Sequence, residues 1–391
     1  MNDKATTTAE DDTPHRDDPA DDPATGQSLP LSGPPDERLP LIFQNQDRLA
    51  HVDDPIHRDV SALAVSGRTL FATCDETASI ERLVFDADKG AFTDHVSFPL
   101  GAIFDLPDGV DGEMDIEGLE IADGWLWICG SHSLKRDGPD GEGLAGLDDI
   151  DWDPNRAFLG RLPLLDRGDG VFEPVALVEP VGGERREAAA LKMNDKGGPM
   201  RRRLEDDPLL GPFMSLPCKE NGFDIEGFAA HGETVWIGLR GPVIGSHAII
   251  IELQLKEKKS KGRRLKPQKI DGRRYRLYGI DLDGQAIRDL RFREGVLYLL
   301  SGATTDLEAM QSVYRIEQWP PETDIVPAHK VERVLDLPVL RGSDHAEGLC
   351  FFRRQEGWDM LIAYDSPDDD RIDDDNCMVE VDVYPMPSAG K

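Results

Sequence analysis

The sequence predicts an all-β protein built as a single β-propeller of five four-stranded blades. Three observations lead to this prediction. A strand–turn–strand pattern with glycine in the turn begins at residues 59, 115, 224, 286 and 345. A third strand follows every copy, and a fourth follows four of them. An apolar strand near the N-terminus is left over to complete the last unit. Repeated units of four antiparallel strands are typical of propeller blades.

Each copy opens with an apolar strand, and the strand after the glycine turn is rich in aromatic and β-branched residues. The predicted third strands are Ile80–Phe85, Ala157–Leu162, Ala248–Leu253, Ser312–Ile316 and Met378–Val383. The predicted fourth strands are Thr93–Phe98, Phe172–Glu179, Tyr275–Asp281 and Val331–Leu337.

The last unit runs out of chain after its third strand. We expect Leu39–Gln44 to supply the missing strand and to close the ring. Closure through both ends of the chain would also remove two exposed sheet edges.

The interval between residues 115 and 224 is 109 residues long, about twice the others. It holds one complete unit followed by a polar stretch, for which we predict a helical insertion at residues 182–213. A sixth, degenerate blade in this interval is the competing interpretation.

Residues 1–38 contain ten acidic and three basic residues and almost nothing apolar. Such a composition cannot bury enough surface to offset the entropy of ordering, so we predict a disordered acidic tail. The propeller domain is expected to span residues 39–388.

The whole chain carries a formal charge of −32, with 76 acidic and 44 basic residues. A surface of this charge repels phosphates, so we expect no nucleic-acid partner. No apolar run approaches the ~18 residues of a membrane span, and no membrane association is expected. The five cysteines are scattered without a C-x-x-C pair, which favours reduced cysteines in a cytoplasmic protein.

The repeats also bring charged residues together. First strands of propeller blades lie beside the central axis, so equivalent positions point to one place. The third position of the five copies reads Ser61, Glu117, Glu226, Arg288 and Glu347. The first position reads Asp59, Asp115, Asp224, Ala286 and His345. Second strands end on the same face, at or beside Asp75, His132, Arg240 and Asp365. The sequence therefore predicts an acidic mouth at one end of the axis.

Carboxylates gathered in this way repel one another by ~4 kcal/mol per close pair at an effective dielectric constant near 20. Ca²⁺ or Mg²⁺ would relieve the repulsion, because both prefer hard oxygen ligands. The predicted metal ligands are Glu117, Glu226, Glu347, Asp115 and Asp224. Arg240 would orient a small anionic ligand and His132 would transfer protons, as in a metal-assisted hydrolase of a phosphate ester, ester or lactone.

The alternative is a purely structural network, in which Arg288 and Arg240 neutralise the glutamates and the protein is a non-catalytic scaffold for a protein partner. Full pairing of all three glutamates would favour the scaffold. Carboxylates left open for coordination would favour the cation site.

Several ordered motifs resemble a known family. They are the two D-I-E-G copies at 115–118 and 224–227, the run Gly238–Pro242, the segment Ile287–Leu290 and the copy His345–Leu349. Together they resemble the bacterial family called domain of unknown function 3616, over roughly residues 40 to 385. The resemblance implies a propeller and no established activity. The E-G strand starts are also similar in style to esterase-like phytases and lactonase-type metal propellers.

One basic segment stands apart from the acidic chain. Residues 256–276 hold eleven basic residues against two acidic ones. An exposed hairpin tip is the simplest interpretation, and an anion-binding surface is the alternative.

Overall fold

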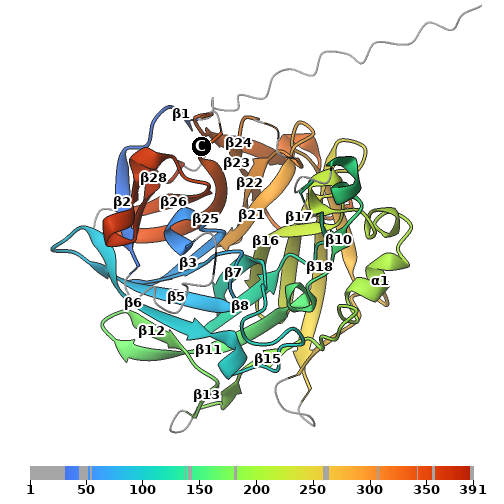
Figure 1. Cartoon of the computed structure of the whole chain (residues 1–391), viewed down its shortest axis with the longest axis horizontal. Coiled ribbons are helices and arrows are strands. Elements are labelled where there is room, and N and C mark those ends of the chain that lie inside the picture. Colours follow the sequence, from blue (N-terminus) through green and yellow to red (C-terminus); the bar gives the residue numbers. More distant parts are fainter. Residues whose placement is uncertain are drawn as a thin grey trace, which may run out of the picture.

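The described strands are grouped by repeat into units of four, here called sheets. The units of the first and last repeats are joined into one nine-stranded sheet by the parallel pairing of Leu41 with Phe92. The computed structural model describes residues 31–43, 52, 55–136, 138–139, 143–179, 183–258, 264–305, 307, 309–340, 342–354 and 357–387 of the 391-residue chain. In Figure 1 the sheets surround a common centre, and the first strand of each sheet lies nearest to it. This is an all-β, propeller-like arrangement, as the sequence predicts.

The strands of the first three sheets follow the repeats. The first sheet contains β3 (Ala62–Ser66), β4 (Thr69–Thr73), β5 (Ser79–Asp86) and β6 (Ala91–Pro99). The second contains β7 (Ile116–Ala122), β8 (Trp125–Gly130), β11 (Leu159–Gly168) and β12 (Val171–Pro174). The third contains β16 (Asp224–His231), β17 (Thr234–Gly241), β18 (His247–Glu257) and β20 (Arg276–Asp281), and β19 (Leu265–Pro267) pairs with the end of β18.

The last two sheets include the N-terminal strands. The fourth contains β21 (Ala286–Arg293), β22 (Val296–Gly302), β23 (Ser312–Glu317) and β24 (Val331–Asp336), with β1 (Leu31–Ser32) parallel to β24. The fifth contains β25 (His345–Arg354), β26 (Gly357–Asp365), β28 (Met378–Pro385) and β2 (Glu37–Ile42). All six residues of β2 pair antiparallel with β28, so the N-terminal strand does supply the fourth strand of the last unit.

Two strands begin within the last eight residues of the predicted disordered tail. Residues 1–30 lie outside the described residues, whereas β1 and the start of β2 fall within the predicted tail of residues 1–38. Both are held by backbone pairing, with β24 and β28 respectively. An acidic composition does not prevent an edge strand from forming where a neighbouring strand offers free backbone groups.

The insertion near residues 182–213 is much less helical than predicted. Its α-helix, α1 (Arg201–Glu205), has five residues. The two-residue strands β14 (Arg186–Glu187) and β15 (Ala189–Ala190) pair with β13 (Leu177–Val178) and β11. Polarity alone therefore misled the prediction, because the segment takes its backbone partners from the second sheet.

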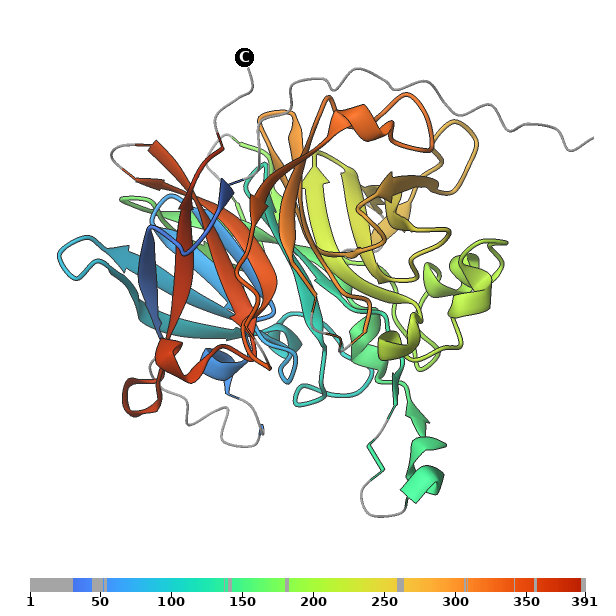
Figure 2. The ribbon, with the colours of Figure 1, turned by 90° about the horizontal axis from the view of Figure 1, so that it is seen from above.

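Long connections project on one side of the molecule. The small hairpin of β9 (Lys135–Arg136) and β10 (Ile150–Asp151) extends from that side in Figure 2. The loop carrying β27 (Ile372–Asp373), red in Figure 2, projects toward the same side from the opposite edge of the molecule, and the segment with α1, yellow-green, lies at the edge nearer the hairpin. Short 3-10 turns occur in the connections of the described chain, at Ile56–Arg58, Leu100–Ala102, Gly143–Leu147, Pro154–Ala157, Gly211–Phe213, Cys218–Glu220, Ala328–Lys330, Asp369–Arg371 and Asp374–Asn376.

The hydrophobic core consists of five clusters, each between two neighbouring sheets. Trp127 of the second sheet and Phe228 of the third belong to one cluster, and Phe71 of the first sheet and Phe158 of the second belong to another. The remaining clusters join the third to the fourth sheet, the fourth to the fifth and the fifth to the first. All five cysteines are free thiols. No helix in the described part of the chain has the length and apolar character needed to cross a membrane.

Arg291, on the innermost strand β21, joins the sheets at the axis. Its guanidinium donates hydrogen bonds to the backbone oxygens of Leu63 (2.6 Å) and Phe228 (3.1 Å) and to that of Leu349. These carbonyls belong to β3, β16 and β25, the inner strands of three other sheets. Asp289 lies 2.9 Å from the same guanidinium and balances its charge.

We predict that Arg291→Met lowers the free energy of unfolding by about 3–5 kcal/mol, because it leaves the buried Asp289 carboxylate without its charged partner. Urea unfolding followed by circular dichroism measures the change. The matched control is Arg185→Met, whose side chain is 60% exposed and which should change stability by about 0.5 kcal/mol or less. Equal stability of the two variants would contradict the role given to Arg291.

Candidate functional site

A cavity of about 280 Å³ opens at the axial mouth that the repeats predict. It is lined by charged residues from all five repeats and from the turn before β16. They include Asp75, Glu117, Lys219, Arg240, Arg288, Asp344, His345, Glu347 and Asp365. Seven of these residues were predicted from the sequence as site residues, and they come from all five repeats. They are Asp75, Glu117, Arg240, Arg288, His345, Glu347 and Asp365.

β-Bulges re-aim the third position in four of the five repeats, and Glu117, Arg288 and Glu347 among these residues line the cavity. The strand ladder passes from Ile116 to Gly118 without pairing Glu117. Glu226, Arg288 and Glu347 are skipped in the same way on β16, β21 and β25. A bulge leaves one residue without a cross-strand partner and re-aims its side chain. Four charged side chains thereby leave the regular alternation of their strands.

The glycine after two of these bulges allows the inner strands to approach closely. A Cβ atom on Gly118 would come within 2.4 Å of Cβ of Phe228 on the neighbouring inner strand. A Cβ atom on Gly227 would lie 2.8 Å from Cγ2 of Ile287. The repeated Glu-Gly pair therefore combines a re-aimed carboxylate with a close contact between sheets.

Two of the three predicted glutamates are paired with arginines. Arg288 Nε lies 2.7 Å from Glu226 Oε2, in an ion pair whose angle does not give a hydrogen bond. The other end of the Arg288 guanidinium pairs with Glu347. Arg240 Nη1 donates to Glu226 Oε1 at 2.9 Å and lies 3.8 Å from Asp224. Arg288 thus bridges two carboxylates from different sheets.

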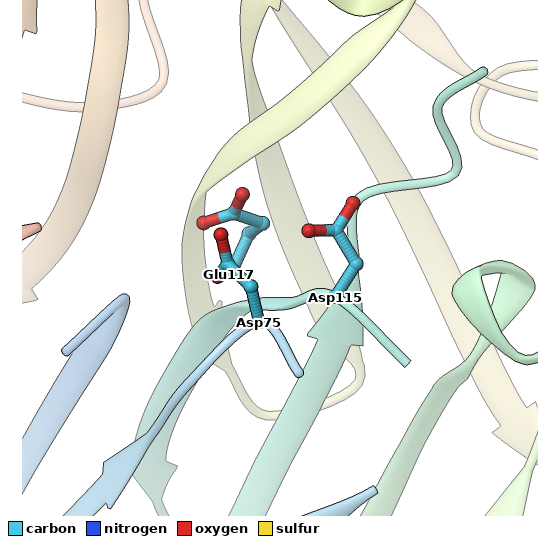
Figure 3. A group of neighbouring side chains, drawn as sticks. All are labelled: Asp75, Asp115 and Glu117. Carbon is cyan, nitrogen blue, oxygen red and sulfur yellow. The ribbon is translucent and has the colours of Figure 1, made fainter. Parts of the chain in front are cut away.

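Glu117 is different. Its side chain is only 7% exposed, and among the described residues it has no hydrogen bond or ion pair. Carboxylate oxygens of Asp75, Asp115 and Glu117 all lie within 4.8 Å of one another. Figure 3 shows Asp75, which follows β4, reaching toward Asp115 and Glu117 at the start of β7. These three residues are the group best placed to hold a cation.

The partners of Asp75 and Asp115 leave oxygens available. Oδ1 of Asp75 is buried without a hydrogen-bond partner. Oδ2 of Asp115 lies 3.3 Å from Arg156 Nη1, which compensates part of its charge. Asp115 has a positive φ of 50°, and its backbone N–H donates to the Asp75 carbonyl at 3.0 Å. The two aspartates are therefore fixed to each other through the backbone.

Burial dominates the electrostatics of the site. Burial raises the pKa of Glu117 well above its usual range, and the charges of Asp75 and Glu226 raise it further. Burial likewise raises the pKa of Asp75, with additional contributions from Asp59 and Asp115. The pKa of Asp224 rises to about 8 through burial and through Glu226, although Arg240 opposes the shift. Without a cation, protons compensate this excess of negative charge.

The structure does not bring His132 to the cavity. Its side chain is 1% exposed, and both ring nitrogens are buried without hydrogen-bond partners. Burial and the neighbouring Arg201 lower its pKa to about 3, so the ring stays neutral near pH 7. This placement argues against the predicted role in proton transfer. The repeat alignment marks where second strands end but not which way the next side chain turns.

Lys219, Gln311 and Asp344 line the cavity and were missed by the sequence reasoning. Lys219 lies in the 3-10 turn Cys218–Glu220 between the insertion and β16, and the other two lie outside the aligned positions of the repeat. No periodic signal marks such residues.

The fold and the site together define a propeller-like all-β protein with a charged axial cavity. The chain belongs to the family described as protein of unknown function (DUF3616), whose model matches residues 59–382. No curated protein matches the chain significantly.

Solved structures similar to the chain share little sequence with it. Glutaminyl cyclase from Myxococcus xanthus is 10% identical, with 91% of this chain and 99% of that chain covered and a TM-score of 0.38. A calcium-binding protein, regucalcin, from Agrobacterium tumefaciens is 10% identical, with 90% and 95% covered and a TM-score of 0.36. Scores of this size carry no argument about what this chain does.

We predict that the metal-free protein loses stability as the pH rises from about 4 toward about 8, the interval set by the ordinary and the raised pKa of Asp224. The folded state holds the proton of this carboxyl more tightly than the unfolded state does. Raising the pH therefore favours unfolding. Urea unfolding at a series of pH values, with chelator present, measures the slope.

Asp224→Asn is the control for this prediction, because the amide cannot ionise. Its stability should depend less steeply on pH over the same interval. Burial raises the pKa of Glu120 to about 7, so Glu120 also makes stability fall with rising pH. It does so in both proteins, and the difference between their pH profiles therefore reports on Asp224. Parallel pH profiles of the two proteins would refute the assignment.

Proposed function

We propose that this protein binds a divalent cation, Ca²⁺ or Mg²⁺, at the axial mouth through Asp75, Asp115 and Glu117. The observation that carries the proposal is the buried Glu117 carboxylate, which has no partner among the described residues and lies beside two aspartates. Three carboxylates supply the hard oxygen donors that both ions prefer. The proposal treats the five sheets as blades of one propeller, closed by β2.

Cationic side chains at the same cavity suit a small anionic ligand. Lys219, Arg240 and Arg288 line the cavity together with Glu117. An anion that entered the mouth would meet these side chains as well as the bound cation. The hydrogen bond from Arg240 to Glu226 fixes the guanidinium in place, so it can contact a ligand without first moving.

Metal-assisted hydrolysis of a phosphate ester, ester or lactone is the enzymatic form of this proposal. A bound divalent cation polarises a phosphoryl or carbonyl oxygen and lowers the pKa of bound water. In this chain the arginines would orient the anionic group of the substrate. His345, which lines the cavity, replaces His132 as the histidine placed near the substrate.

The non-catalytic scaffold remains the second candidate. The pairing of Glu226 and Glu347 with Arg288 supports it, since such a network stabilises contacts between sheets. The scaffold accounts for two of the three glutamates and leaves the position of Glu117 without a role.

We expect Ca²⁺ at about one hundred times its dissociation constant to raise the free energy of unfolding by ~2.7 kcal/mol. Glu117→Gln should bind the ion at least about tenfold more weakly, because it removes one charged oxygen ligand. Isothermal titration calorimetry and urea unfolding with Ca²⁺, Mg²⁺ or chelator measure both effects.

The matched control is Glu179→Gln, whose side chain is 65% exposed and lies outside the cavity. It should bind the ion as the unchanged protein does. If neither ion bound or stabilised the unchanged protein, the cation site would be wrong and the scaffold would be favoured.

We expect inorganic phosphate to bind the Ca²⁺-loaded protein more tightly than the chelator-treated protein. Lys219→Met should weaken this binding about tenfold, since it removes one cation from the wall of the cavity. Calorimetric titration with phosphate measures it. Identical phosphate affinity with and without Ca²⁺ would show that the anion does not contact the cation, and this would contradict metal-assisted hydrolysis.

A further inference from the structure

A second and larger cavity, of about 700 Å³, lies away from the axis at the outer strand β20 of the third sheet. Three segments far apart in the sequence form its walls. They are residues 203–209 after and within α1, residues 273–279 leading into β20, and residues 324–325 before β24. The basic segment at residues 256–276, which the axial site does not use, ends in this cavity.

Specific contacts fasten these walls together. Tyr275 donates its hydroxyl hydrogen to Asp207 Oδ2 at 2.5 Å, which ties the insertion to the third sheet. Oδ1 of Asp207 accepts the backbone N–H groups of Leu209 and Leu210 at 2.8 and 3.1 Å. Backbone hydrogen bonds from Gly279 to Asp324 and from Val326 to Gly279 hold the third wall. The cavity is therefore built by the fold rather than left between loose loops.

Four arginines and three aspartates line the cavity. Arg203, Arg273 and Arg274 line it, and none of them has an ion pair with another described residue. Arg276, by contrast, pairs with Asp271. Burial and the nearby Arg274 and Arg202 lower the pKa of Arg203, which indicates that like charges lie close together.

The three aspartates of the walls do not pair directly with these arginines. Asp207 accepts the three hydrogen bonds described above. Asp206 and Asp324 are exposed to solvent and form no ion pair with another described residue. Arg203, Arg273 and Arg274 are therefore left without a direct ion pair among the described residues, in a chain with a net charge of −32.

The floor of the cavity is apolar. Ile244, Ile249 and Leu277 contribute to it, together with the ring of Tyr278. At its edges, Leu209 and Ile325 are 52% and 53% exposed, so two large apolar side chains face solvent beside the arginines. A volume of this size and an apolar lining with a few polar groups are typical of small-molecule sites.

We propose that this cavity binds a small molecule with a flat apolar body and one tetrahedral oxyanion group, such as a phosphate or sulfonate. The apolar body lies against Ile249 and Leu277 and covers Leu209 and Ile325. The oxyanion accepts hydrogen bonds from Arg203 and Arg274, whose planar guanidinium groups match such oxygens in pairs. The site is separate from the axial mouth and does not depend on the proposed function.

The test uses 2-naphthalenesulfonate as the probe and calorimetry as the measurement. We expect one binding site on the full chain. The neutral 2-naphthalenemethanol and the headgroup analogue methanesulfonate should each bind at least about tenfold more weakly, because each lacks one half of the recognised chemistry.

Variants locate the site. The double variant Arg203→Gln/Arg274→Gln should weaken binding of 2-naphthalenesulfonate at least about tenfold, and Ile325→Ser should weaken it severalfold. Arg185→Gln, an exposed arginine outside the cavity, and Glu117→Gln at the axial mouth should leave it unchanged. Circular dichroism confirms that each variant is folded.

Three results would overturn the proposal. They are no detectable binding of 2-naphthalenesulfonate, equal affinity for the sulfonate and the neutral alcohol, and full affinity in the double arginine variant. Because Glu117→Gln is measured beside the cavity variants, failure of this site is distinguishable from failure of the axial cation site.

Discussion

One buried guanidinium, that of Arg291, joins the inner strands of this molecule at its axis. Arg291 lies three residues further along β21 than Arg288 and bonds to carbonyls on three other inner strands. Because the carbonyls of an inner strand otherwise lack partners toward the axis, one five-donor side chain satisfies several of them at once. Glu120 lies three residues beyond Glu117 on β7, and the positive charge of Arg291 opposes the rise of its pKa on burial. Polar contacts of Arg291 and Asp289 therefore lie among the inner strands.

Most of the fold could be predicted from the sequence because each repeat encodes its own turn and two alternating strands. The N-terminal strand β2 could also be predicted, since one unit lacked a partner. The insertion could not, because its short strands exist only through pairing with β11 and β13. The residues of a hairpin are enough to predict it, because both of its strands and its turn are local in sequence. A two-residue strand forms only where the edge of another strand lies beside it in the folded protein.

The part of the candidate site that repeats from unit to unit could also be predicted from the sequence. The repeat places a charged residue at each bulge, so Glu117, Arg288 and Glu347 were expected at one mouth and line one cavity. Their pairing was not predictable. The choice of which glutamates form ion pairs with Arg288 depends on the distances between side chains across the axis. Those distances depend on the close approach of the sheets at Gly118 and Gly227. His132 was misplaced because its direction depends on a positive φ of 55° that no pattern revealed.

The charge balance of the mouth gives the strongest reason to look for a ligand there. Arg240 and Arg288 neutralise Glu226 and Glu347, and Arg156 serves Asp115. Asp75 and Glu117 have no ion pair with a described residue, and both have raised pKa values for which burial is the main cause. A purely structural network would gain nothing from two buried acids that must stay protonated to be tolerated. A cation site gains from them directly, because the ion replaces the protons and the same burial that raises the pKa values strengthens its attraction to the ionised oxygens.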